Sequence, residues 1–318
     1  MREPWFWRQH GAAARAAAAA LSPLSLLYDS GQRLRKRMTV AKRVGVPIIC
    51  IGNATLGGAG KTPLSIAVLS LLAERGIRPF FLSRGYGGTL AGPLRVGAHL
   101  TSEVGDEPLL LAAHAPVVIA RKRVDGACLA ARDGAQAIIM DDGYQNPTLV
   151  KDVSVLIRSG GVNRRIFPAG PYREPFERAA ARADAIVAID EDCAETDCFG
   201  KPLLVARSNL RAPMAPQPVF AFCGIARPER FFSSLEKCGF SLAGAQAFAD
   251  HHPYAESEIR ALKSAAAARG VRLITTEKDF VRLNAEMRQG IAAAGLTLTI
   301  DKAEAFTDLI VSKAGLAA

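Results

Sequence analysis

The stretch IGNATLGGAGKTP, residues 51–63, constrains the fold more than any other part of the sequence. It follows an apolar run at 46–51 and precedes a helical pattern at 62–75, which is the strand–loop–helix order of a phosphate-binding loop. Glycines in such a loop let backbone N–H groups converge on phosphate oxygens, and the helix N-terminus adds partial positive charge. The stretch therefore predicts an α/β domain that binds the phosphates of a nucleotide.

The loop ends as the signature G-x-x-x-x-G-K-[ST] requires, but Thr55 stands where the first glycine is usual. Lys61 is expected to reach the β- and γ-phosphates, and the Thr62 hydroxyl to ligate magnesium. A structural glycine turn is the alternative, but it does not explain a lysine and a threonine at these positions. The expected nucleotide-binding residues are Thr55, Leu56, Gly57, Gly58, Ala59, Gly60, Lys61 and Thr62.

Short apolar runs alternate with helical patterns after the first 43 residues. The runs predict strands at 46–51, 79–82, 116–120, 137–140, 153–157 and 185–189, with helices at 62–75 and 122–132. Continuous β-branched runs that alternate with helices indicate a parallel sheet covered by helices on both faces. The fold expected is an α/β, P-loop NTPase-like domain at 44–206.

A Pro-rich stretch at 207–218 resembles a linker. A smaller α/β domain is expected beyond it, at 219–318, with strands at 219–223 and 271–275. Two domains are the natural expectation for a chain of 318 residues.

Two carboxylates follow an apolar strand in the stretch AIIMDDGYQN. Asp141 and Asp142 are placed at the carboxyl end of a buried strand, beside the glycine loop of a parallel sheet, and there they would suit a magnesium ion or its waters. Asp-Asp before a glycine is also an ordinary turn. No N-K-x-D guanine-binding motif is present, which argues against a standard GTPase.

Other residues of functional type sit mostly where predicted strands end, the side on which such sheets bind ligands. A capped helix, a solvated charge or a tight turn would explain each one alone. They are Ser83, Arg84 and Tyr86 in LSRGYGG, Asp106 and Glu107 in VGDEP, Arg121 and Arg123 in ARKRVDG, Arg173 and Glu174 in FPAGPYREP, and Asp250, His251 and His252 in FADHHPY.

Positive charge is concentrated at the N-terminus. Residues 1–50 hold nine basic and two acidic side chains, so this segment carries +7 of the net +10 of the chain. A nucleic-acid-binding protein would usually spread its basic surface over a folded domain or groove. Arg15 and Pro23 interrupt the apolar residues, so neither a secretory signal nor a transmembrane helix is indicated.

The N-terminal segment at 1–43 is expected to contain an amphipathic helix. Ser22 and Pro23 predict its N-cap and first position, and Leu24, Leu27, Tyr28 and Met38 lie near one face at helical spacing. Trp5, Phe6 and Trp7 add aromatic residues of the kind found at membrane interfaces. The helix would lie on an anionic membrane surface, or would pack on its own domain with solvated arginines.

These motifs, in this order, resemble the tetraacyldisaccharide 4'-kinase family of lipid A biosynthesis. The match covers nearly the whole chain, in SPLSLLYDSGQRLRKR, IGNATLGGAGKTP, SRGYGG, GDEP, DDGYQN, FPAGPYREP, FAFCGIARPERFF, DHHPY and TTEKD. The phosphate loop of the family also carries threonine where the first glycine is usual, so Thr55 looks like a family variant.

The resemblance implies transfer of the γ-phosphate of ATP, with Mg²⁺, to the 4'-hydroxyl of an acylated glucosamine disaccharide 1-phosphate, which gives lipid IVA. It also implies a P-loop core domain, a smaller α/β domain and an N-terminal helix that meets the bilayer. We expect a monomer that binds inner-membrane lipids and no nucleic acid. It would lie at the cytoplasmic face of the bacterial inner membrane, peripheral or monotopic.

The resemblance also assigns roles to residues. Asp106 of GDEP would be the catalytic carboxylate, supported by His251 rather than His252, with Lys61 offsetting phosphoryl charge. Asp141, Asp142 or Glu107 would join Thr62 as metal ligands. Substrate contacts are expected from Ser83, Arg84, Tyr86, Arg121, Arg123, Arg173 and Glu174. On chemical grounds the arginines would offset charge on the phosphoryl oxygens, or Arg121, Arg123 or Arg173 would instead hold the 1-phosphate, because guanidinium matches phosphate oxygens bidentately. The family commonly has histidine where this chain has Asn146, so the role of that histidine does not transfer.

Two other classes of protein remain possible on the residues alone. A soluble P-loop kinase of a small metabolite would not need an apolar segment with a charge of +7. A nucleotide-dependent RNA-binding module would show salt-sensitive affinity for nucleic acid. Neither class accounts for the ordered set of motifs.

Overall fold

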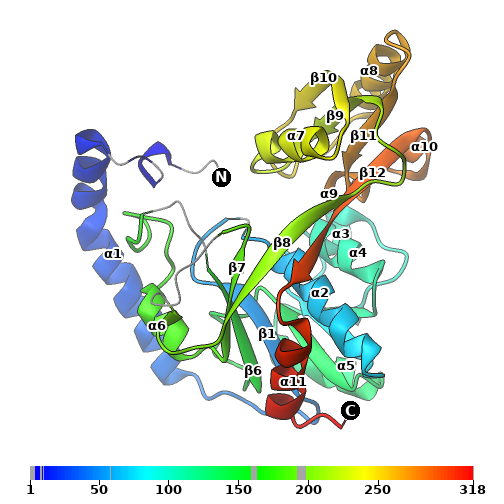
Figure 1. Ribbon diagram of the computed structural model, residues 1–318. Coiled ribbons are helices and arrows are strands. Elements are labelled where there is room, and N and C mark those ends of the chain that lie inside the picture. Colours follow the sequence, from blue (N-terminus) through cyan, green and yellow to red (C-terminus); the bar gives the residue numbers. More distant parts are fainter. Residues whose placement is uncertain are drawn as a thin grey trace.

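The computed structural model describes residues 4–7, 9, 11–57, 59–158, 163–191 and 198–317. Gly58 of the glycine loop lies outside the described residues, as do Arg2 and Arg8 of the basic N-terminus. The described strands form one 12-stranded sheet in the order β10-β9-β11-β12-β8-β7-β6-β1-β5-β2-β4-β3 (Figure 1). The strands are β1 (Ile48–Asn53), β2 (Pro79–Ser83), β3 (Leu94–Arg95), β4 (Val117–Ile119), β5 (Ala137–Asp141), β6 (Val153–Arg158), β7 (Ala185–Ile189), β8 (Leu203–Arg211), β9 (Pro218–Cys223), β10 (Ser241–Ala247), β11 (Arg272–Thr276) and β12 (Ile291–Ile300).

Helices connect most of these strands. They are the 3₁₀-helix η1 (Trp5–Trp7) and the α-helices α1 (Ala12–Met38), α2 (Lys61–Glu74), α3 (Thr101–Val104), α4 (Asp106–Ala112), α5 (Arg123–Arg132), α6 (Phe176–Ala181), α7 (Pro228–Lys237), α8 (Glu256–Ala267), α9 (Glu277–Phe280), α10 (Ala285–Arg288) and α11 (Ala303–Ala314). The strands and helices predicted in the core and the second unit are confirmed, with boundary shifts of one or two residues.

The core of the molecule is a parallel sheet with helices on both faces, as predicted. Strand β1 pairs in parallel with β5 and β6, and all six of its residues are buried. Leu64 of α2 and Ile310 of α11 pack on one face, and Ala127 of α5 and Phe176 of α6 pack on the other. Because β1, β2, β4 and β5 run parallel, their carboxyl ends meet at one edge of the sheet.

The second unit holds β9, β10, β11 and the first half of β12 in parallel pairs. An antiparallel ribbon of β8 and β12 joins it to the core (Figure 1). Residues 207–211 of the predicted linker are therefore strand, because the ladder with β12 satisfies their backbone groups. Helix α11 lies within the predicted second domain but returns to the core, where Phe306 and Ile310 are buried.

Helix α1 begins earlier than predicted. It spans Ala12–Met38 with Pro23 inside it, so the prediction that Ser22 caps its N-terminus is wrong. The alanine run before Pro23 has the highest helix propensity, and tertiary contacts offset the interruption. Ser25 Oγ, for example, donates to Ile166 O at 2.8 Å.

Buried ion pairs attach α1 to the core. Arg178 of α6 donates to Asp29 of α1 at 2.7 Å. Lys36 of α1 and Arg182 donate to the buried carboxylate of Glu174 at 3.0 and 2.8 Å. The face of α1 against the core is thus small and polar, and it includes buried Ala14, Ala18, Ser25 and Asp29.

The outer face of α1 is apolar. Leu24, Leu27, Leu34 and Met38 are 53–76% exposed and recur at helical spacing, whereas Tyr28 packs against Phe167 with ring centroids 5.4 Å apart. Figure 1 shows α1 running along one side of the core. Within the described residues, α1 and every other helix is too short or too polar to cross a membrane.

We predict that Glu174→Gln lowers the free energy of unfolding by about 2 kcal/mol at neutral pH, because it leaves two half-buried cations without their carboxylate. Burial opposes ionisation of Glu174, but Arg182 and Lys36 outweigh it and lower its pKa. This stabilisation is therefore present above the ordinary glutamate pKa and is lost as pH falls through the lowered value.

Urea unfolding across pH would measure the effect, with Glu177→Gln as the control because Glu177 is an exposed neighbour on the same segment. Equal stabilities of the two variants at neutral pH would contradict the prediction.

Candidate active site

The glycine loop joins β1 to α2 and holds Lys61 over its own backbone. Gly60 has φ +80°, a left-handed backbone conformation that favours glycine, and a Cβ there would lie 2.7 Å from the terminal methyl of Ile189. Lys61 Nζ lies 3.4 Å from Gly57 O, 3.5 Å from Asn53 Oδ1 and 3.7 Å from Asp142 Oδ1. These oxygens hold an ammonium group at the N-terminus of α2, where a phosphate would bind.

Thr55 is part of the structure of the first turn. Its buried hydroxyl accepts a hydrogen bond from Asn53 Nδ2 at 2.8 Å. The next residue, Leu56, donates its N–H to Pro171 O at 2.8 Å, and Thr55 forms a β-bridge with Tyr172. The loop FPAGPYREP thus supports the turn that a glycine usually makes.

Asp141 ends β5 directly beneath Thr62. Thr62 Oγ1 donates to Asp141 Oδ2 at 3.2 Å, and Ser65 Oγ donates to Oδ1 at 3.0 Å. Burial and the charges of Glu107 and Asp142 raise the pKa of Asp141. Crowded, desolvated carboxylates of this kind are stabilised by a cation.

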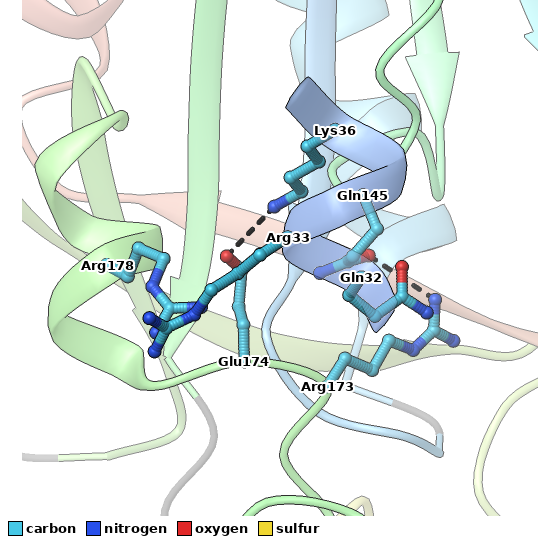
Figure 2. Close-up of a pocket in the computed structure, with 7 residues that line it drawn as sticks. All are labelled: Gln32, Arg33, Lys36, Gln145, Arg173, Glu174 and Arg178. Atoms are coloured by element: carbon cyan, nitrogen blue, oxygen red, sulfur yellow. Dashed lines mark hydrogen bonds and ion pairs between the residues drawn. The ribbon is translucent and has the colours of Figure 1, made fainter. Parts of the chain in front are cut away.

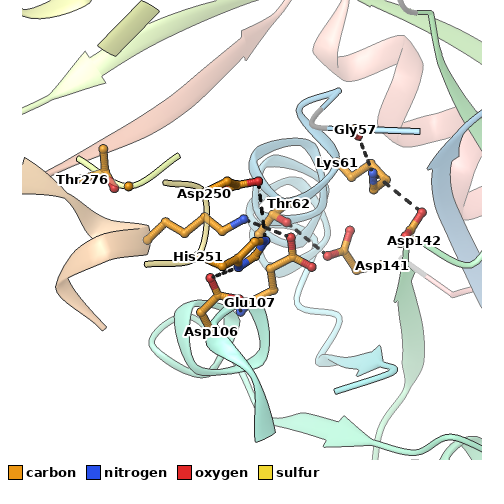
Figure 3. A network of polar contacts seen from close by, with 12 residues as sticks. Gly57, Lys61, Thr62, Asp106, Glu107, Asp141, Asp142, Asp250, His251 and Thr276 are labelled. Atoms are coloured by element: carbon orange, nitrogen blue, oxygen red, sulfur yellow. Dashed lines mark hydrogen bonds and ion pairs between the residues drawn. The ribbon is translucent and has the colours of Figure 1, made fainter. Parts of the chain in front are cut away.

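The donor set suits a magnesium ion that is shared with nucleotide phosphates. Asp141, Asp142, Glu107 and Thr62 all offer oxygen, and Figure 3 shows these side chains around one space beside Lys61. Among the described residues, no group of three or more His, Cys, Asp or Glu side chains forms a complete metal site. Mg²⁺ commonly keeps waters and phosphate oxygens and takes only one or two protein carboxylates, so the residues present fit.

Asp106 begins α4 immediately after Gly105, which has φ +89° and whose Cβ position would lie 2.2 Å from Tyr86 O. Its buried carboxylate receives donors from the second unit. His251 Nδ1 lies 2.9 Å from Asp106 Oδ2, and Arg282 donates to the same oxygen from Nη2 at 2.5 Å and Nε at 3.1 Å. Figure 3 shows His251 reaching Asp106 from the opposite unit.

The charges around Asp106 keep it ionised. Burial alone would raise its pKa, but the hydrogen bond from His251 and the charges of Lys278 and Arg282 outweigh it and hold the pKa well below its usual range. Lys278 also pairs with Glu107 at 3.5 Å. A carboxylate in this state is ready to accept a hydrogen bond from a hydroxyl group.

The two neighbouring histidines point in different directions. His251 faces Asp106, and its other nitrogen lies 3.9 Å from Asp250 Oδ2. His252 stacks on Phe248 at 4.8 Å and faces Glu258 at 2.9 Å within its own unit. The geometry thus places His251, and not His252, beside the candidate base.

The predicted substrate residues lie at several depths along the same edge of the sheet. Arg123 is buried, its Nη1 donates to Ala120 O, and its Nε has no hydrogen-bond partner in the described structure. Burial and nearby Arg84 lower the pKa of Arg123 to about 10. Arg121 instead donates to Thr89 O at 3.3 Å on the surface. Ser83 is buried, whereas Tyr86 is 71% exposed beside His251.

Arg173 lies in a basic pocket between α1 and the core (Figure 2). Its Nη1 donates to Gln145 Oε1 at 3.3 Å, and its Nη2 lies 3.8 Å from Asp142 Oδ2. The pocket is lined by Gln32, Arg33, Lys36, Gln145, Arg173, Glu174 and Arg178. The carboxylate of Glu174 is already paired with Lys36 and Arg182, so Glu174 stabilises the pocket wall and does not present a free carboxylate to a ligand.

Two further residues of the site are absent from the predicted set. Lys278 lies in α9, within the TTEKD motif, and Arg282 follows α9; only folding brings them to Glu107 and Asp106. Ser65 could have been predicted from the sequence, because it lies one helical turn after Thr62 and therefore faces the same strand end. Asn146 accepts hydrogen bonds from Thr148 N and Oγ1 at 2.9 and 2.8 Å, so it stabilises its own turn.

Comparison with known proteins agrees with this geometry. Residues 17–314 match the family tetraacyldisaccharide-1-P 4'-kinase. The tetraacyldisaccharide 4'-kinase of Rhodospirillum rubrum is 42% identical over 98% of this chain and 97% of its own length, and that of Paramagnetospirillum magneticum is 44% identical over 97% and 98%. The crystal structure of LpxK from Aquifex aeolicus in complex with ATP is 28% identical, with a TM-score of 0.78 over 93% of this chain and 99% of that one. The chain belongs to the tetraacyldisaccharide-1-P 4'-kinase family.

Proposed function

We propose that this protein transfers the γ-phosphate of ATP to the 4'-hydroxyl of a tetraacyldisaccharide 1-phosphate. The observation that supports this most directly is the facing arrangement of Lys61 on the phosphate loop and the Asp106–His251 pair across the carboxyl ends of the strands. One group suits the donor phosphates, and the other suits an acceptor hydroxyl. The family relatives carry the name of this reaction.

In the proposed reaction Asp106 accepts the proton of the acceptor hydroxyl as its oxygen bonds to the γ-phosphorus and ADP leaves. His251 holds the carboxylate in place through the 2.9 Å contact to Oδ2. Lys61 offsets the charge that spreads over the phosphoryl oxygens. A magnesium ion held by Thr62 with Asp141, Asp142 or Glu107 would neutralise further phosphate charge.

Guanidinium groups would bind the anionic parts of the acceptor, because they match phosphate oxygens bidentately. Arg123 is buried, and the charges of Asp141 and Asp142 partly offset the lowering of its pKa by burial, so it is a candidate for binding phosphate beside these carboxylates. Arg173 lies in the basic pocket beside α1, so it is the better candidate for a second phosphate near the membrane. Arg121 faces Thr89 at the surface and is the weakest of the three.

We propose that α1 lies on the membrane with its apolar face down. Its outer face exposes Leu24, Leu27, Leu34 and Met38, while Arg35 and Arg37 near its end are also exposed and can meet anionic headgroups. Apolar side chains in this number are costly in water and favourable at a lipid interface. A peripheral helix would keep the acyl chains of the substrate in the bilayer while its sugar reaches the strand edge.

Lys61→Ala should abolish transfer of labelled phosphate from γ-labelled ATP to tetraacyldisaccharide 1-phosphate in detergent micelles, with a loss of at least about 10²-fold. Labelled lipid from the wild type and none from the variant would support donor, acceptor and loop together. ATP-binding wild-type protein that gave no labelled lipid would contradict the acceptor and favour a soluble one.

Asp106→Asn should reduce kcat by about 10²- to 10⁴-fold, because it removes a general base. The apparent KM for ATP should change much less, since Asp106 does not belong to the phosphate loop. Steady-state kinetics would measure both constants. Asp250→Asn is the control, because it makes the same carboxylate-to-carboxamide change beside His251 but leaves Asp106 intact. Near-normal turnover of Asp106→Asn would remove it as the base.

Leu27→Asp combined with Leu34→Asp should weaken binding to vesicles containing phosphatidylglycerol by more than about 10-fold, because two leucines would no longer enter the interface. Leu296→Asp is the control, since Leu296 is 47% exposed on β12 in the ribbon between the two units, away from α1. Sedimentation with vesicles would measure binding. Unchanged sedimentation of the double variant would show that another surface binds the membrane.

A further inference from the structure

Arg282 is the most heavily bonded charged side chain near Asp106. It follows α9 in the second unit, and only 5% of its side chain is exposed. Its Nη2 and Nε donate to Asp106 Oδ2. Its Nη1 donates to Gly224 O at 2.9 Å and to Asp279 Oδ1 at 2.8 Å. One guanidinium therefore binds the candidate base of the core and two acceptors of the second unit.

The two oxygens of Asp106 have unequal surroundings. Oδ2 receives His251 Nδ1 and two nitrogens of Arg282, which fills its acceptor capacity. Among the residues that the structure describes, Oδ1 receives only the backbone N–H of Glu107, at 3.0 Å. An acceptor hydroxyl would therefore find a free lone pair on Oδ1 alone.

We propose that Arg282 is a positioning residue for the phosphoryl transfer: together with His251 it occupies Oδ2 of Asp106 and so presents Oδ1 to the acceptor hydroxyl. This inference rests on the proposed role of Asp106 as the base. It assigns part of the active site to the second unit, because both donors to Oδ2 come from there. Catalysis then depends on how that unit is placed against the core.

The anchoring of Arg282 makes it suited to this role. Asp279 is fully buried, and its Oδ1 also accepts from Gly224 N at 2.9 Å and Tyr254 Oη at 2.8 Å. Its Oδ2 accepts from Thr276 Oγ1 at 2.6 Å. A guanidinium held in such a network has little freedom, so its position can fix the rotamer of Asp106.

Holding the two units together would not require all of the hydrogen bonds that Arg282 makes. Lys278 and Glu107 already form an ion pair between them at 3.5 Å. A purely adhesive arginine would gain from spreading its donors over both oxygens of Asp106, the usual bidentate geometry. Instead, Nε and Nη2 of Arg282 both donate to Oδ2 of Asp106, the oxygen that His251 also contacts.

The test is a double-mutant cycle between Arg282→Met and Asp106→Asn, assayed by the transfer of labelled phosphate to the lipid acceptor. In the otherwise native protein, Arg282→Met should lower kcat by about 10- to 100-fold, and the KM for ATP should stay within about threefold. In the Asp106→Asn protein the same substitution should lower kcat less than about twofold, because Arg282 acts through Asp106.

Arg288→Met is the matched control for folding. Arg288 belongs to the same unit and donates to Phe280 O and Val281 O at 3.1 Å, but it does not touch Asp106. Its loss should leave kcat within about twofold of the wild type. Arg282→Lys restores the charge and one donor, so it should recover about tenfold of the kcat lost in Arg282→Met. If the methionine variant does not fold, the cycle is run with Arg282→Lys, whose smaller loss should likewise vanish in the Asp106→Asn protein.

Three results would overturn the inference. The first is that Arg282→Met lowers kcat by the same factor in the native protein and in the Asp106→Asn protein. The second is that Arg282→Met keeps kcat within twofold of the wild type. The third is that Arg282→Met lowers kcat no more than Arg288→Met does. Inactive Asp106→Asn with normal Arg282→Met would refute the role of Arg282 and leave the base in place. Active Asp106→Asn would instead refute the base itself.

Discussion

The parallel pairing of β1 with β5 and β6 is the constraint on which the rest of the structure depends. Parallel strands align their carboxyl ends, so the glycine loop after β1 and Asp141 at the end of β5 meet at one edge of the sheet. Thr62 and Ser65 of the following helix then reach the two oxygens of Asp141. The order of the strands therefore places the phosphate loop beside Asp141, and only Thr62 and Ser65 are needed to connect the two.

A second set of charges completes the site from outside the core. Asp106 and Glu107 begin α4 on the core, and His251, Lys278 and Arg282 approach them from the second unit. The β8–β12 ribbon links the two units through the chain, and these polar contacts fix the Asp106 carboxylate against the second unit. An active site assembled in this way requires both units to be folded and in contact.

An ordinary surface helix turns its apolar face to the core and its polar face to solvent, and α1 does the reverse. Its polar and small residues, such as Ser25 and Asp29, face the protein, and its leucines face outward. Two buried carboxylates fix the helix to the core: Asp29 of α1 pairs with Arg178, and Glu174 of the core pairs with Lys36 of α1. The exposed leucines of the outer face therefore take no part in this attachment.

The sequence by itself determined the local elements and their order. Apolar runs, the glycine loop and the motif order predicted the parallel sheet, the phosphate loop and the family, because these depend on short-range periodicity and spacing. The start of α1 was missed because proline at position 23 signals a helix start in isolation, whereas contacts such as that of Ser25 with Ile166 hold the helix through it. Only the tertiary structure decided that Arg282 and His251 share one oxygen of Asp106, and that β8 replaces part of the linker. Such contacts join residues more than 80 positions apart, and no local pattern specifies them.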